Sequence, residues 1–188
     1  MSFKISLLKF WSKMKEKAIN LKETSFTQAI NISAQWCKEW GEDLLSEEVL
    51  ADRVAELIKT KNGLRGFFAY ALSDQDCYLL DKLPFSVVFK FQEGGNDVVE
   101  IIVKNLIMSS AQIVVHDREN NFEYKSNSEN ISERCKSILR VLETKSVTKN
   151  INQIMKDLDN LGNSFDNSKK YNDKQKQFIK HQILDIAQ

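Results

Sequence analysis

The chain has 188 residues, 42% of them hydrophobic, and a formal net charge of +1. This length and composition indicate a globular protein with a sizeable core and exclude a disordered chain. The near-neutral charge gives no general attraction to nucleic acid or to an anionic membrane, so we expect neither as a partner of the whole chain.

One proline and six glycines, with abundant Leu, Ile, Lys and Glu, favour helices. We therefore expect an all-α fold, a single multi-helix bundle. The odd number and wide spacing of Cys37, Cys77 and Cys135 predict reduced thiols in a cytoplasmic protein, and no disulfide framework or zinc site. We expect no signal peptide, membrane span, metal or cofactor.

Residues 3–22 are predicted to form a first, amphipathic helix. Its apolar stripe contains Phe3, Leu7, Phe10, Trp11 and Met14. Lysines occupy much of the remaining surface, at positions 4, 9, 13, 15, 17 and 22. Such a helix either packs by its aromatic face with solvated lysines, or contacts a membrane surface or phosphates.

A second helix is predicted from a cap at Thr24 or Ser25 to about Trp40, with Gly41 as its stop. Its face includes two tryptophans spaced four residues apart, which are typical core or interface anchors. A third helix is expected after Ser46, ending at Asn62-Gly63.

Gly66, which precedes two phenylalanines, indicates close backbone packing within residues 64–72. Pro84 is expected in the first turn of a short helix that runs to about Phe91. The alternation within residues 85–92 also permits a strand, but no partner strand is evident.

The most apolar stretch, residues 96–118, is predicted to be the central helix of the bundle, with Asn96 as its cap. Within this helix Asn105, Ser109, Gln112 and His116 follow steps of four, three and four residues and form one polar stripe. The stripe is either a ligand-binding groove or a solvated or structural face.

Residues 119–130 are polar and are expected to form a surface loop, or a short hairpin. Helices should follow from Ser128 or Asn130 to Gly162 and, after a linker, from about Asn172. This division predicts a helical domain over 1–162 and a linker with a C-terminal helix over 163–188, which docks on the body or stays partly loose.

The common catalytic and phosphate-binding motifs are missing from the sequence, so we expect no catalytic residue. The segments DRVAELIKTKNGLRGFFAYAL (52–72) and VVEIIVKNLIMSSAQIVVH (98–116) resemble a family of small, uncharacterised, all-helical cyanobacterial proteins. The resemblance runs from the second helix to about residue 145. It implies a helical fold and a cyanobacterial cytoplasmic origin, and it transfers no site.

Two functions follow as hypotheses. The first is a non-catalytic interaction or regulatory protein. The second is an enzyme or small-ligand-binding protein, because arginines near a polar stripe hold carboxylates or phosphates. Its predicted binding residues are Arg53, Arg65, Asn105, Ser109, Gln112 and His116.

The first helix is the predicted contact with partners. We expect Phe3, Leu7, Phe10, Trp11 and Met14 to pack on the body near Trp36 and Trp40, or to mediate self-association or binding to another protein. Contact of Lys9, Lys13 and Lys17 with nucleic acid is a weaker alternative.

Overall fold

The computed structural model describes residues 21–142, 144–159 and 171–187. Within these ranges all regular structure is helical, which confirms the all-α prediction. The predicted first helix lies outside the described residues, except for its last two positions. The α-helices are α2 (Phe26–Gly41), α3 (Glu47–Ile58), α4 (Lys61–Ser73), α5 (Phe85–Glu93), α6 (Gly95–Arg118), α7 (Phe122–Val141), α8 (Thr144–Asp159) and α9 (Asp173–Leu184). Short 3-10 helices, η1 (Leu21–Glu23) and η2 (Asp185–Ala187), lie at the two ends.

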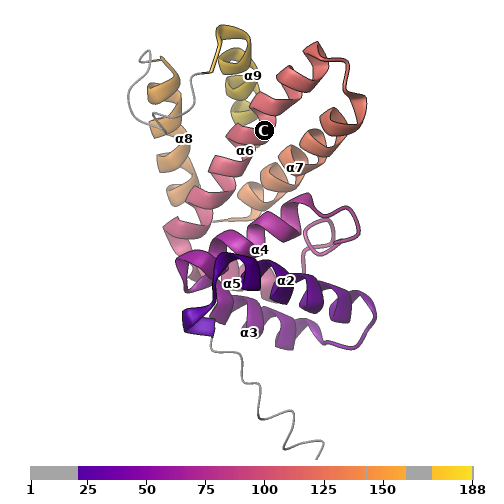
Figure 1. The fold of residues 1–188 in the computed structure, drawn as a ribbon. Coiled ribbons are helices and arrows are strands. Elements are labelled where there is room, and N and C mark those ends of the chain that lie inside the picture. The colour runs from indigo at the N-terminus through magenta and orange to yellow at the C-terminus, as the bar shows by residue number, and fades with distance from the viewer. Residues whose placement is uncertain (1–20, 143, 160–170, 188) are drawn as a thin grey trace, which may run out of the picture.

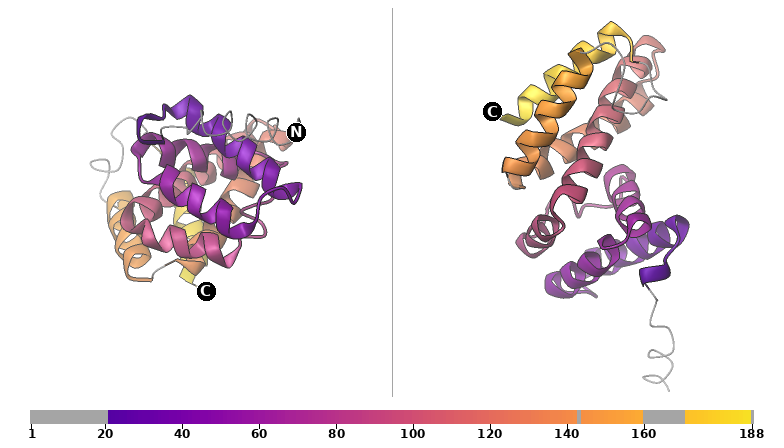
Figure 2. Two further views of the ribbon diagram at one scale, coloured as in Figure 1. Left: turned by 90° about the horizontal axis from the view of Figure 1, so that it is seen from below. Right: turned by 90° about the vertical axis from the view of Figure 1, so that its left-hand side faces the viewer.

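The helices form two packed groups that α6 connects (Figure 1). Helices α2 to α5 lie together in the lower part of the view, and α7, α8 and α9 surround the upper part of α6. The side view in Figure 2 shows α6 running from the lower group into the upper one. Because α6 contacts α4, α5, α7, α8 and α9, the prediction of a central helix is confirmed.

The core of the lower group is built on aromatic rings. Phe67 and Phe68 from α4 meet Phe91 from α5, with ring centroids 5.1 to 5.8 Å apart. All three side chains are almost completely buried. Offset and edge-on ring contacts of this kind add to the stabilisation that burial alone gives.

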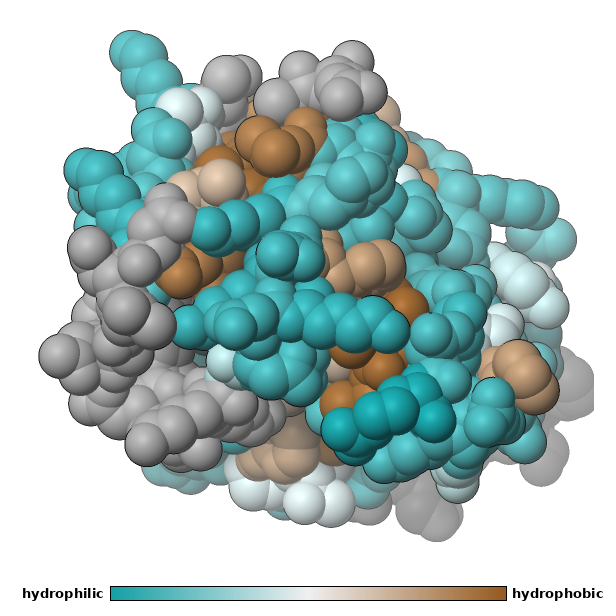
Figure 3. All heavy atoms as spheres, turned by 90° about the horizontal axis from the view of Figure 1, so that it is seen from above, coloured by the Kyte–Doolittle hydropathy of each residue, from teal (hydrophilic) through white to brown (hydrophobic). Residues whose placement is uncertain are grey.

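Helix α6 is long and apolar enough to cross a membrane if only length and composition are considered. In the fold, Ile102, Leu106 and Ile107 are at most 2% exposed, and the neighbouring helices cover them. Seen from above, the surface is mostly hydrophilic, with apolar side chains in small patches between polar ones (Figure 3). The apolar side chains of α6 therefore form the core of the bundle.

Several helix starts lie where the sequence places them, because the capping side chains make the expected hydrogen bonds. The Ser25 hydroxyl accepts a hydrogen bond from the Gln28 N–H, and the Gln28 side chain accepts one from the Ser25 N–H. Ser46 and Asn172 cap α3 and α9 through their side-chain oxygens. Helix α5 begins directly after Pro84, so the helical reading of residues 85–92 is confirmed and the strand alternative is wrong.

The predicted stop of the third helix at Asn62-Gly63 is wrong. Helix α3 ends at Ile58, and the Thr60 hydroxyl accepts a hydrogen bond from the Gly63 N–H, which starts α4 instead. A β-carbon on Gly63 would lie 1.9 Å from the Leu57 carbonyl oxygen. The glycine therefore permits a close turn between two helices and does not end one.

Asn96 does not cap the central helix, which corrects a second prediction. Helix α6 begins one residue earlier, after Gly94, with Gly95 in the left-handed region at φ 59°. The Asn96 carboxamide oxygen accepts hydrogen bonds from Ser146 at 3.2 Å and Asn150 at 3.0 Å. Its side chain thus holds α8 against α6.

The polar segment 119–130 is also not a loop, because most of it is the first half of α7. Asn120 reverses the chain with φ at 54°, and the Asn121 side chain accepts a hydrogen bond from the Tyr124 N–H at 3.3 Å. Burial of Ser128 against the rest of the fold shows that packing extends into this polar half.

The C-terminal helix docks on the body, the first of the two predicted alternatives. Ile179 and Ile183 of α9 are at most 1% exposed, and α9 packs on α6. The Lys136 ammonium lies 2.7 Å from the Asp185 carboxylate and fixes the last turn to α7. The predicted end of the preceding helix at Gly162 lies outside the described residues, and the domain boundary after 162 stays a prediction.

Candidate functional site

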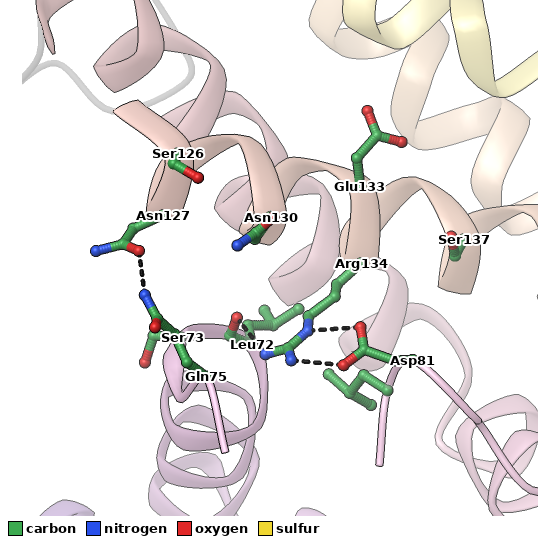
Figure 4. A pocket seen from close by; sticks show the side chains of 11 residues that line it. Leu72, Ser73, Gln75, Asp81, Ser126, Asn127, Asn130, Glu133, Arg134 and Ser137 are labelled. Carbon is green, nitrogen blue, oxygen red and sulfur yellow. Dashed lines mark hydrogen bonds and ion pairs between the residues drawn. The ribbon is translucent and has the colours of Figure 1, made fainter. Parts of the chain in front are cut away.

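A cavity of about 570 Å³ opens between the C-terminal end of α4, the segment that follows it, and α7. Its polar lining comes from Ser73, Gln75, Asp81, Ser126, Asn127, Asn130, Glu133, Arg134 and Ser137. Figure 4 shows the Arg134 side chain extending from α7 toward Asp81 across the floor of the cavity.

Arg134 is 8% exposed and donates hydrogen bonds to six oxygen atoms. Its Nε and Nη2 reach the Asp81 carboxylate at 2.9 and 2.6 Å. The guanidinium also contacts four carbonyl oxygens, of Ala71 at 3.2 Å, Leu72 at 3.1 Å, Asp74 at 2.8 Å and Cys77 at 2.9 Å.

Two of these carbonyls belong to the last turn of α4, where no backbone N–H of the helix can reach them. The Arg134 guanidinium therefore acts as a side-chain cap for α4 and holds the segment that leads to α5. Its hydrogen bond with Asp81 raises the pKa of Arg134. The charge and donors of Arg134 are thus satisfied within the fold and are not available to a ligand.

The remaining lining of this cavity is mostly uncharged. Gln75 and Asn127 hydrogen-bond to each other across its mouth (Figure 4), and Glu133 pairs with Lys136 at 2.6 Å. Hydroxyl and carboxamide groups can hydrogen-bond a small polar molecule, but they are not an activated nucleophile with a base. Within the described residues, no group of three or more side chains that could hold a metal ion is found.

The two arginines of the sequence-predicted site lie on different helices with different partners. Arg53 on α3 is 3.2 Å from the Glu39 carboxylate and stacks on Trp36 at 5.8 Å. Arg65 on α4 is exposed and stacks on Phe26 at 5.3 Å. Both arginines contact residues of α2, which agrees with structural roles at that interface.

The four side chains of the predicted polar stripe of α6 differ in exposure and in hydrogen bonding. The Asn105 amide donates to the Ile101 carbonyl at 2.8 Å, and the Ser109 hydroxyl donates to the Leu106 carbonyl at 3.1 Å. Gln112 is exposed. His116 is half-buried near the ring of Tyr124, and its buried Nδ1 has no hydrogen-bond partner.

Asn105 and Ser109 thus each bond to the backbone of their own helix. Arg53 and Arg65 lie on different helices and contact different residues of α2. Ligand binding by the six residues stays a prediction.

A second surface is more unusual, because it exposes large apolar side chains. Leu44 is 73% exposed, Tyr78 is 60% exposed, and both line a cavity of about 550 Å³ with Trp40. The Ser86 hydroxyl donates to the carbonyl of Glu47, which lines this cavity, at 3.4 Å, so the start of α5 with the 83%-exposed Phe85 lies near it in the chain. We call the surface formed by Trp40, Leu44, Tyr78 and Phe85 the Trp40 face.

Acidic side chains border the Trp40 face. Residues 39–48 contain Glu39, Glu42, Asp43, Glu47 and Glu48, and no lysine or arginine. Lys82 is the basic side chain that lines the cavity itself. Backbone N–H donation and the Ser46 hydroxyl lower the pKa of Glu48, which keeps this carboxylate charged. The Trp40 face is therefore apolar at its centre with carboxylates at its edge, two of which are paired, Glu39 with Arg53 and Glu42 with Lys38.

Sequence reasoning identified Trp40 as an anchor but did not identify Leu44, Tyr78 or Phe85. These residues lie in three segments, at the α2–α3 connection, after α4 and at the start of α5. The sequence shows the acidic residues within 39–48, but it does not show which apolar residues they border.

A family model described as "uncharacterised conserved protein UCP020893" matches residues 25–186. The match extends beyond residue 145, where the resemblance was expected to end, and it includes α9. Neither a curated protein nor a solved structure matches the chain. The expected resemblance to an uncharacterised helical family is confirmed, and the cyanobacterial origin stays a prediction.

Proposed function

We propose a non-catalytic protein-interaction or regulatory role in the cytoplasm for this chain, which belongs to the conserved family described above. The observation that supports this role is the Trp40 face. Leu44, Tyr78 and Phe85 expose most of their side chains, and Leu44 and Tyr78 line the same cavity. Exposed apolar groups that are clustered and bordered by charge are typical of protein-binding surfaces.

The chemistry of the Trp40 face selects a basic, amphipathic segment as its partner. An aromatic or aliphatic stripe would fill the cavity beside Trp40, and lysines beside the stripe would pair with the acidic edge. Residues 3–22 of the chain have this composition, with lysines around the apolar stripe of Phe3, Leu7, Phe10, Trp11 and Met14.

The segment is long enough to reach the Trp40 face from the point where it joins the body. Helix η1, which contains the last two residues of the segment, contacts α3 and lies at the start of α2, whereas Trp40 lies at the other end of α2 (Figure 1). Twenty residues in helical form would extend about 30 Å, which is enough to cross a small domain. We therefore propose that the segment binds the Trp40 face, either of its own chain or of a second copy.

A peptide titration tests this function. A fluorescently labelled peptide of residues 1–22 is added to a variant that comprises residues 23–188, whose helicity is first checked by circular dichroism. We expect saturable binding that weakens with salt, because the charges at the edge are exposed. Replacing Lys9, Lys13 and Lys17 of the peptide by Glu should abolish the binding.

A matched pair of exposed residues provides the control. Leu44→Asp places a charge on the Trp40 face, whereas Phe122→Asp changes a side chain of nearly equal exposure, 72% against 73%, on α7. We expect Leu44→Asp to weaken binding at least roughly tenfold, which corresponds to about 1.4 kcal/mol, and Phe122→Asp to leave it unchanged. Equal effects of the two substitutions would contradict the assignment of the surface.

The location of the partner follows from the mass of the full-length chain in solution. Binding within one chain predicts a monomer, in which deletion of residues 1–22 lowers the melting temperature. Binding between copies predicts a dimer that becomes a monomer after the deletion.

A further inference from the structure

A third cavity, of about 530 Å³, lies between the turn that joins α3 to α4 and the first half of α6. Part of its lining is apolar, because Ile58 and Leu64 are each 8% exposed and Ile101 is half-buried. The charged residues that line it are Lys59, Lys61, Arg65, Asp97, Glu100 and Lys104. Among the described residues, none lines both this cavity and that of the Trp40 face, so a ligand bound here is independent of the function proposed above.

Charges of opposite sign reach the cavity from different helices. Lys61 and Arg65 come from α4, and Asp97 comes from the first turn of α6. Within the ranges that the structure describes, these three side chains form no ion pair. The other charged residues at the cavity have partners close in sequence, Lys59 with Glu56 and Lys104 with Glu100. Two cations and a carboxylate thus line one cavity without neutralising each other.

The contact between Arg65 and Phe26 leaves the guanidinium group able to bind an anion. The guanidinium carbon lies over the Phe26 ring, 5.3 Å from its centre. Stacking of this kind uses the face of the planar group, whereas the N–H donors point outward from its edge. A carboxylate can therefore accept two parallel hydrogen bonds from Arg65. Lys61 lies four residues earlier on the same face of α4 and adds a second positive charge.

We propose that this cavity binds a small zwitterion, an α-amino acid with an aliphatic side chain. The carboxylate of the ligand pairs with Arg65 and Lys61, its ammonium group pairs with Asp97, and its side chain lies against the apolar part of the lining. The volume is within the range of about 300–1,000 Å³ that is usual for small-molecule sites. Phosphate fits less well because the carboxylates of α6 repel a dianion, and a simple amine fits less well because two cations face it.

The bound amino acid connects two parts of the fold. Lys61 and Arg65 belong to the lower helix group, and Asp97 belongs to α6, which runs on into the upper group (Figure 1). A ligand that pairs with both sides therefore holds the start of α4 against α6. Because it binds the folded chain, it should also raise the melting temperature.

The test titrates the ¹⁵N-labelled full-length chain with L-leucine and follows the backbone signals of Lys61, Arg65 and Ile101 by nuclear magnetic resonance. Two analogues each lack one charged group. Isocaproate keeps the carboxylate and the side chain, and isoamylamine keeps the ammonium group and the side chain. We expect saturable shifts with leucine and binding of each analogue that is at least roughly tenfold weaker.

Inorganic phosphate is the control for an unselective anion site, and we expect it to bind more weakly than leucine. Three results would each overturn the proposal. They are the absence of saturable shifts with leucine, equal affinity for leucine and either analogue, and tighter binding of phosphate.

Two variants assign the two ends of the ligand. In Arg65→Gln we expect leucine and isocaproate to bind at least roughly tenfold more weakly, while isoamylamine is not weakened. In Asp97→Asn we expect leucine and isoamylamine to be weakened, while isocaproate is not. All three replaced side chains, including that of the control below, are exposed, so the variants should keep the helicity of the wild type in circular dichroism.

Arg118→Gln is the matched control, because it removes a 68%-exposed arginine side chain from the other end of α6. It should leave the binding of all three compounds unchanged. Loss of all three compounds to the same extent in Arg65→Gln and Asp97→Asn would overturn the assignment of the two ends, as would a loss in Arg118→Gln of the same size.

Discussion

Replacement of Arg134 by alanine should be among the most destabilising single changes on α7. The side chain is 8% exposed and holds the Asp81 carboxylate together with four carbonyl oxygens of residues 71–77. Removing it leaves a carboxylate without its cation and the C-terminal end of α4 without its cap. Each buried carbonyl oxygen left without its donor costs about 1–3 kcal/mol, and we expect a total loss of about 3–5 kcal/mol.

Two further substitutions separate charge from geometry. Arg134→Lys keeps the charge but lacks the planar fork of donors, so it should lose most of the carbonyl contacts and roughly half of the stabilisation. Asp81→Asn keeps an acceptor beside the guanidinium, and because the Asp81 side chain is 41% exposed, we expect a cost of only about 1 kcal/mol.

Urea unfolding followed by circular dichroism measures these differences in the free energy of unfolding. Arg118→Ala is the control, because Arg118 forms an ion pair with Glu119 in which its side chain is 68% exposed. An exposed pair contributes about 0–1 kcal/mol. If Arg134→Ala costs no more than Arg118→Ala, the role of Arg134 as the cap of α4 is refuted.

Three other changes test the core, the helix contact and one ion pair. Ile102→Ala removes a fully buried side chain from α6 and should cost about 2–5 kcal/mol in urea unfolding; a loss of a few tenths would show that the core is wrongly assigned. Gly66→Ala should lower the melting temperature, because the new methyl group would lie 2.4 Å from the β-carbon of Ala29; an unchanged melting temperature would contradict the close approach of α2 and α4. The hydrogen bond and charge of Lys136 lower the pKa of Asp185. The stabilisation of the fold by this ion pair is therefore present above the ordinary carboxyl pKa near 3.8 and is lost as the pH falls through the lowered pKa. The difference in unfolding free energy between wild type and Asp185→Asn should therefore be largest at neutral pH and vanish in acid; a difference that does not change with pH would exclude the ion pair.

The sequence predicted the elements whose signals are local. Ser25, Ser46 and Asn172 cap helices through their own side chains, and Pro84 precedes a helix through its fixed backbone angle. The apolar stretch after residue 95 is the central helix because its composition alone requires burial.

Features that depend on distant partners were not predictable in the same way. The segment 119–130 is polar, and it is helical because Asn121 caps it and α6 supports the helix that it begins. Local propensity is a weak signal when tertiary contacts decide the structure. Asn96 has the chemistry of a cap, but its carboxamide is used by side chains of α8 instead.

The same limit applies to the candidate sites. Arg134 binds backbone carbonyls about 60 residues earlier in the chain, and any residue type supplies a carbonyl, so no sequence pattern marks the contact. The exposed groups of the Trp40 face likewise come from three separate segments.

The most direct test of the proposed interaction is the nuclear magnetic resonance signal of the Trp40 indole N–H. Spectra of the ¹⁵N-labelled chain comprising residues 23–188 are compared before and after addition of the unlabelled peptide of residues 1–22. We predict a shift of the Trp40 indole signal and of the backbone signals of Leu44 and Tyr78, with no change at Phe122. A peptide that leaves the Trp40 signal in place at saturating concentration would contradict the proposed binding of the segment to this face.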